Sequence, residues 1–146
     1  MGKLRDSGKL PRNLIIKSSA ILAPTNPASC SLLECLGADT ISVSSDLSTA
    51  EISTIREATQ APLDIYVESP DGIGGFVRHF ETPELIEHCS PIYIKLGLRN
   101  SADIYPYDRH MKSLALSLSP ERVRRSKLVY TSSSENTQML KCQKRV

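Results

Sequence analysis

The sequence predicts an α/β protein built from parallel βαβ units. Short apolar segments rich in β-branched residues alternate with segments that show helical periodicity and helix-capping residues. The predicted strands cover residues 40–44, 63–68 and 92–96. Strands and helices that alternate at this spacing are typical of parallel sheets with right-handed crossovers. A full eight-unit (β/α) barrel needs roughly 200 to 250 residues, so the 146 residues here predict a partial TIM-type (β/α) barrel, a fragment of a longer chain.

Charge divides the chain into three predicted regions. The net charge of +2 combines +4 over residues 1–17, −7 over residues 18–119 and +5 over residues 120–146. We expect a basic N-terminal arm over residues 1–13, the partial barrel domain over residues 14–130 and a disordered tail over residues 131–146. Basic ends around an acidic body are typical of solvated termini, so nucleic acid is not the predicted partner.

The first predicted elements precede the glycine at position 37. The apolar run 13–24 predicts a buried strand, which a turn cluster containing Pro24 and Pro27 ends. The segment 28–38 predicts a helix, because its leucines and cysteines form one apolar face. Gly37 stands where a C-cap glycine belongs.

The middle and the end of the chain carry further helix signals. In residues 47–62, Ser48 and Glu51 have the spacing of a capping box. Thr82 predicts the N-cap of a helix that Pro83 opens. Two more helices are expected, and they cover residues 111–118 and 121–130.

The strand ends select the candidate catalytic residues, because the loops after the strands build the active site of a (β/α) barrel. Glu68 and Asp71 follow the second strand and form a candidate acid–base pair. Lys95 lies in the third strand, where it is a candidate Schiff-base lysine or a partner of Glu68. His79, beside the glycine-rich loop, is the best acid–base candidate among the histidines.

Further polar and flexible positions at these strand ends predict substrate contacts. The candidate substrate-binding residues are Asp46, Gly74, Gly75, Arg99 and Asn100. The glycines do not follow a nucleotide-binding pattern and instead predict a mobile loop that can close over a ligand. Arg99 supplies positive charge for a carboxylate or a phosphate.

The sequence offers few signals for a cofactor, a metal or a membrane. The cysteines at positions 30, 35, 89 and 142 form no C-x-x-C pair, and the histidines have no ligand spacing, so no metal is predicted and the cofactor is unknown. No apolar run is long enough for a membrane span, and the N-terminus lacks the pattern of a secretory signal. The predicted location is cytoplasmic.

Residues 29–99 resemble the collagenase-like peptidase family of unassigned catalytic type, family U-thirty-two. The resemblance rests on an "LGA" segment before a strand and on a "dLs-x-x-E-I-x-x-I" helix after it. The matching residues are Gly37, Ala38, Leu47, Ser48, Glu51, Ile52 and Ile55. The resemblance implies a barrel fold and a peptidase-like hydrolase. The family's cysteine signature is replaced by ESPDGIGGFVRHF, so no cysteine role is transferred.

Three functions follow as expectations. The first is a hydrolase of the peptidase-like class that acts on a small molecule or a peptide. The second is a metal- or Schiff-base-dependent lyase or aldolase that acts on a small oxo-acid. The third is a non-catalytic truncated barrel or interaction module. A half-barrel exposes sheet edges, so a homodimer that closes it is also expected.

Overall fold

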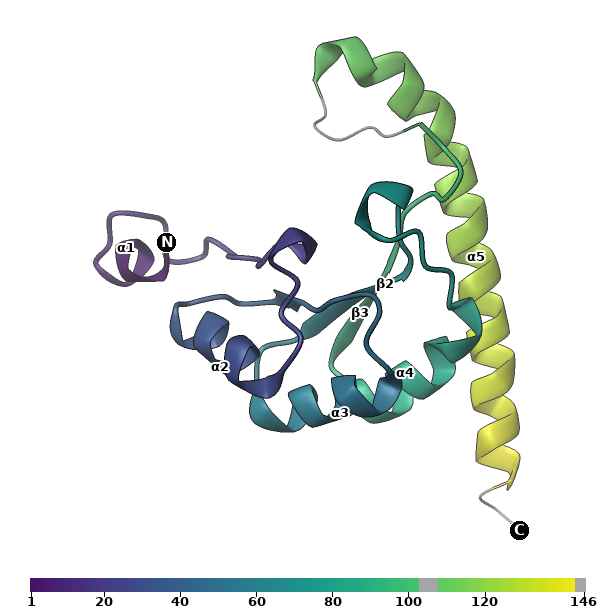
Figure 1. Ribbon diagram of the computed structural model, residues 1–146, viewed down its shortest axis with the longest axis horizontal. Helices are drawn as coiled ribbons and strands as arrows, with labels where there is room; N and C mark the ends of the chain where they lie inside the picture. The colour runs from purple at the N-terminus through teal and green to yellow at the C-terminus, as the bar shows by residue number, and fades with distance from the viewer. Residues whose placement is uncertain (103–107, 144–146) are drawn as a thin grey trace. The chain divides into compact units, whose positions relative to one another are not determined.

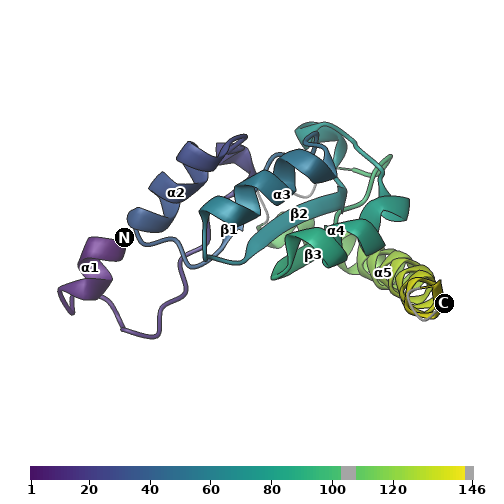
Figure 2. The ribbon, with the colours of Figure 1, turned by 90° about the horizontal axis from the view of Figure 1, so that it is seen from below.

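The computed structural model describes the backbone of residues 1–102 and 108–143, and the side chains of those residues up to residue 134. A three-stranded parallel sheet runs through it in the order β1-β2-β3 (Figure 1, Figure 2). The strands are β1 (Ile41–Ser42), β2 (Leu63–Glu68) and β3 (Ile92–Leu96). Ile41 pairs with Leu63 and Ser42 with Asp64. The predicted α/β class and the predicted parallel strands are confirmed.

The chain forms two compact units, each built from two stretches of sequence. The first unit contains Met1–Ile65 and Glu84–Ile94, and the second contains Tyr66–Pro83 and Lys95–Val146. The division therefore falls within β2 and within β3. The sequence-based boundaries at residues 13 and 130 stay predictions.

The first unit packs two neighbouring helices beside the start of the sheet. These are α2 (Pro27–Cys35) and α3 (Thr49–Ala58), which lie side by side (Figure 1). Both predicted helices are confirmed, with ends within a few residues of the expected ones. The capping box is present, because the Ser48 side chain accepts a hydrogen bond from the Glu51 amide and the Glu51 carboxylate accepts one from the Ser48 amide. Gly37 has a φ of 94°, as its predicted role at the helix end requires.

Apolar side chains from strands and helices fill the core of the first unit. Ile41, Ile52, Leu63 and Leu85 are fully buried. Leu85 belongs to α4 (Thr82–Cys89), the helix between β2 and β3. Thr82 is the first helical residue rather than the predicted N-cap, because a 3-10 turn at His79–Glu81 leads directly into the helix.

The N-terminal segment differs from its prediction. The run 13–24 does not form a strand: only Lys17 pairs with the sheet, through an isolated parallel bridge to Thr40. The Ser19 side chain accepts a hydrogen bond from the Ile21 amide and starts a 3-10 turn over Ala20–Leu22. This local bond competes with strand pairing. A short helix, α1 (Gly2–Asp6), lies within the predicted basic arm.

One long helix replaces two predicted ones in the second unit. Helix α5 (Lys112–Gln143) follows a 3-10 turn at Arg109–Met111 and contains Pro120 (Figure 1). It also continues past residue 130, where the sequence predicts a disordered tail. The hydroxyl groups of residues 131–134 bond carbonyl groups within the preceding turn of this helix. Residues 144–146 lie outside the described part of the chain.

Glu34 joins the end of α2 to the loop after α3. Its carboxylate accepts hydrogen bonds from the Thr59 hydroxyl at 2.5 Å and from the amides of Gln60 at 3.0 Å and Ala61 at 2.8 Å. The Thr59 hydroxyl bond is the main cause that lowers the pKa of Glu34 below its usual value of 4.5. The ionised form is therefore the one that stabilises the first unit.

We expect Glu34→Gln to lower the free energy of unfolding by about 1–3 kcal/mol at pH 7, the usual effect of losing hydrogen bonds to a charged group. Because the pKa is lowered in the folded state, this stabilisation is present above pH 4.5 and is lost as the pH falls further. Urea denaturation at pH 7 and pH 3 measures both effects. Glu57→Gln, at an exposed position of α3, is the control. Equal losses for both variants at pH 7 would contradict the role of Glu34.

Candidate acid–base site

Glu68 is a buried carboxylate at the carboxyl end of β2. Its side chain is only 1% exposed, and the neighbouring core residues Ile65 and Val67 are fully buried. A strand buried on both faces is normal in a parallel sheet, but an ionised carboxylate there needs charged or hydrogen-bonding partners. The partners of Glu68 therefore define the site.

Three groups from different parts of the second unit meet the Glu68 carboxylate. Its Oε1 atom accepts a hydrogen bond from the Arg99 amide at 3.0 Å and forms an ion pair with the guanidinium of Arg125 from α5. Its Oε2 atom lies 3.1 Å from Nε2 of His79. Two of the sequence-predicted residues, Glu68 and His79, thus face one another, and Arg99 contacts Glu68 through its backbone amide.

The contact between Glu68 and His79 is close but not aligned as a hydrogen bond. Neither Oε2 of Glu68 nor Nε2 of His79 has a hydrogen-bond partner among the described residues, although 3.1 Å separates them. At this distance, a rotation of the imidazole is enough to align the pair as a hydrogen bond. The His79 side chain is 32% exposed, so it links the buried carboxylate to the surface.

Asp71 and Arg99 form a second, more exposed pair beside this contact. The carboxylate of Asp71 accepts a hydrogen bond from the Asn100 amide at 2.8 Å, and its other oxygen lies 3.6 Å from Nε of Arg99. Both side chains are about half exposed. The structure therefore places Asp71 as a link between two loops and brings Arg99 and Asn100 to it.

The glycine loop after β2 is closed at its base by hydrogen bonds. Ser69 exchanges bonds with Phe76: its amide donates to the Phe76 carbonyl at 2.9 Å and its hydroxyl accepts from the Phe76 amide at 2.8 Å. Gly74 and Gly75 have φ values of 106° and 63°, which other residues rarely adopt. The predicted mobility of this loop and its closure over a ligand stay predictions.

Two predicted residues have other surroundings. The Lys95 ammonium lies 4.3 Å from the centre of the Tyr66 ring, a cation–π contact. Asp46 belongs to the first unit, where it accepts a hydrogen bond from the Ser44 hydroxyl.

Apart from Arg99, sequence reasoning missed the arginines of the second unit that are described next. Arg125 bridges two carboxylates, because it pairs with Glu68 and its Nε donates to Glu121 at 2.7 Å. Arg124 and Arg125 hold the pKa of Glu121 at about 2. Arg78 pairs with Glu81, and Nε of Arg122 is buried without a hydrogen-bond partner among the described residues. The four-residue spacing of Glu121 and Arg125 was the available signal, but it indicates a helical ion pair and not a link to β2.

Comparisons of the chain with protein-family models, with curated proteins and with solved structures return no match. The resemblance to the collagenase-like peptidase family therefore stays a prediction. In the described part of the chain, no three His, Cys, Asp or Glu side chains come together in the manner of a metal site. No helix within residues 1–102 or 108–143 has the length and apolar character needed to cross a bilayer.

Arg125 and Arg124 offer a matched test of the buried ion pair. Both donate to Glu121, but only Arg125, which is 27% exposed, also pairs with Glu68. We expect Arg125→Leu to lower the free energy of unfolding by about 2–3 kcal/mol, because Glu68 loses a charged partner while it stays buried. Arg124→Leu, at a side chain that is 61% exposed, should cost less than about 1 kcal/mol. Urea denaturation measures the free energy of unfolding of both variants. Equal losses would show that the ion pair of Arg125 with Glu68 does not contribute to stability.

Proposed function

We propose that the second unit carries a general acid–base site of a hydrolase that acts on a small anionic substrate. The observation that carries this proposal is the 3.1 Å contact between Nε2 of the partly exposed His79 and Oε2 of the buried Glu68. A carboxylate in this position orients an imidazole and stabilises its protonated form. His79 is then the group that exchanges a proton with water or substrate.

The proposed proton transfer follows from the buried position of Glu68 and the partly exposed position of His79. His79 accepts a proton from a water molecule at its exposed side, and the water oxygen attacks the substrate. Glu68 stays ionised and stabilises the imidazolium that forms. The ion pair with Arg125 and the hydrogen bond from the Arg99 amide stabilise the negative charge at its other oxygen, Oε1. His79 then returns the proton to the leaving group, so no proton is left on the enzyme.

The charge around this pair supports an anionic substrate. The Arg99 guanidinium is half exposed, and the backbone amide of the same residue bonds the Glu68 carboxylate. Guanidinium groups bind carboxylates and phosphates through paired hydrogen bonds. The cation–π contact of Lys95 with Tyr66 does not favour the lyase alternative with a Schiff-base lysine.

We further propose that the sheet belongs to a larger (β/α) barrel. Consecutive strands are neighbours in the order β1-β2-β3, without the reversal of strand order that marks a doubly wound sheet. Glu68 lies at the carboxyl end of its strand, where barrel enzymes carry their active sites. A second copy of the chain that closes the barrel stays a prediction, which light scattering can test.

The proposed function predicts a selective loss of hydrolysis. We expect His79→Asn to reduce turnover of 4-nitrophenyl phosphate or of the mono-4-nitrophenyl ester of succinate, both anionic, by about 10²–10⁴-fold, the usual contribution of an acid–base group. Glu68→Gln should reduce turnover as well, because the imidazole loses its charged partner. His88→Asn, on the exposed face of α4, should leave the rate unchanged. Circular dichroism checks that each variant is folded.

Two outcomes would contradict the proposal. Equal rates for the His79→Asn and His88→Asn variants would remove His79 from catalysis. No turnover of either ester by the unaltered chain would argue against a hydrolase.

A further inference from the structure

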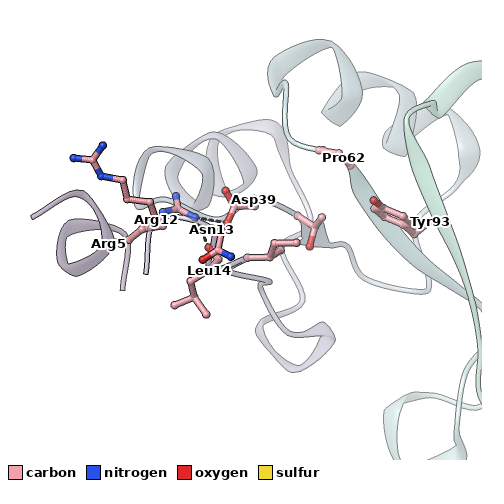
Figure 3. A pocket seen from close by; sticks show the side chains of 9 residues that line it. Arg5, Arg12, Asn13, Leu14, Asp39, Pro62 and Tyr93 are labelled. Atoms are coloured by element: carbon pink, nitrogen blue, oxygen red, sulfur yellow. Dashed lines mark hydrogen bonds and ion pairs between the residues drawn. The ribbon is translucent and has the colours of Figure 1, made fainter. Parts of the chain in front are cut away.

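A pocket in the first unit has no part in the acid–base site. It is open on one side, has a volume of about 510 Å³ and lies between the N-terminal segment and the amino ends of the strands (Figure 3). Its polar lining residues are Arg5, Arg12, Asn13, Asp39, Thr40 and Tyr93. The volume falls within the range of small-molecule sites, roughly 300–1,000 Å³.

Thr40 places a buried hydroxyl without a partner against this pocket. The residue is 4% exposed, and its Oγ1 atom has no hydrogen-bond partner among the described residues. Buried polar atoms are almost always hydrogen-bonded, and a bound water, ion or ligand is one explanation of an exception. Thr40 is therefore a point at which a ligand in the pocket can bond.

The pocket carries an excess of positive charge. Arg5 is held in place, because its guanidinium donates to Asp39 and to the Leu14 carbonyl at 2.9 Å. The bond from the Ile16 amide, the largest cause, and the one from Arg5 lower the pKa of Asp39, so this carboxylate is ionised. Arg12 also lines the pocket, and no described residue neutralises it. An anionic group therefore fits better than a cation.

An aromatic ring forms the opposite side. Figure 3 shows Tyr93 and Pro62 across the pocket from the two arginines. Tyr93 is 53% exposed, and the Lys17 ammonium lies 4.9 Å from the centre of its ring. Lys17 is not among the residues that line the pocket, and the half-exposed ring offers a surface for a flat ligand.

We propose that this pocket binds a small organic anion in which a phosphate or a carboxylate is attached to a flat ring. The anionic group contacts Arg12 and the amide of Asn13, the ring packs on Tyr93, and the Thr40 hydroxyl bonds a polar atom of the ligand. This binding site is separate from the proposed hydrolase site, because all of its lining residues belong to the first unit.

The test uses the full chain and three probes: phenyl phosphate, benzoate and inorganic phosphate. We expect phenyl phosphate or benzoate to bind in calorimetric titrations and to shift the amide resonances of Asn13, Thr40 and Tyr93. The tighter of the two identifies the anionic group. Inorganic phosphate should bind more weakly, because it has no ring. If it binds as tightly as phenyl phosphate, the role of Tyr93 is wrong.

Two pairs of variants separate a specific site from general attraction. Arg12→Gln should weaken binding by at least about tenfold, as the loss of a charge-assisted hydrogen bond predicts. Lys9→Gln removes the same charge from the same segment outside the pocket and should change the dissociation constant less than about twofold. Thr40→Val should weaken binding and leave the melting temperature unchanged, because the hydroxyl has no partner within the described residues.

Three results would overturn the proposal. The first is no binding of any probe. The second is equal weakening by Arg12→Gln and Lys9→Gln, which would indicate diffuse attraction to the basic segment. The third is tighter binding of a single-stranded RNA oligomer that falls steeply with salt, which would assign this surface to nucleic acid.

Discussion

The second unit depends on the burial of one negative charge. Glu68 is placed by β2 at a point where water cannot solvate its carboxylate, and such a charge is tolerated only with partners. These partners come from the turn after β3, from the 3-10 turn before α4 and from α5. Arg125 is in turn held by Glu121 on its own helix. One carboxylate thus determines where four segments of this unit must lie.

Local chemistry explains which parts of the fold the sequence could predict. The capping box of Ser48 and Glu51, the glycine at position 37 and the β-branched apolar residues of β2 act over a few residues, so they are visible without a structure. The strand predicted over residues 13–24 was wrong because of another local interaction. Its apolar residues indicate a strand, but the Ser19 hydroxyl accepts a hydrogen bond from the Ile21 amide, and this bond belongs to a 3-10 turn. Pro120 stands between the two helices predicted over residues 111–118 and 121–130, but a long helix can tolerate the loss of one backbone bond, and α5 runs through it.

The residues of the candidate site also fall into those that the sequence could predict and those that it could not. Glu68, Asp71, His79 and Arg99 were found because they follow predicted strands, where the loops of parallel sheets gather functional groups. Arg125 was not, because 57 residues separate it from Glu68 and its helix is placed by packing. The orphan hydroxyl of Thr40 was equally invisible, since its sequence position only indicates a strand residue. Both units show one arrangement: an arginine neutralises a carboxylate, and a polar atom beside that pair stays unsatisfied.

The interleaving of the two units also has a meaning for gene structure. Each unit takes one long and one short stretch of the chain, and the stretches alternate from the N-terminus to the C-terminus. No single break in the coding sequence can separate them, and a break at any point between residues 66 and 94 divides both at once. An exon boundary, a recombination event or a fusion in that stretch is therefore expected to disrupt both units.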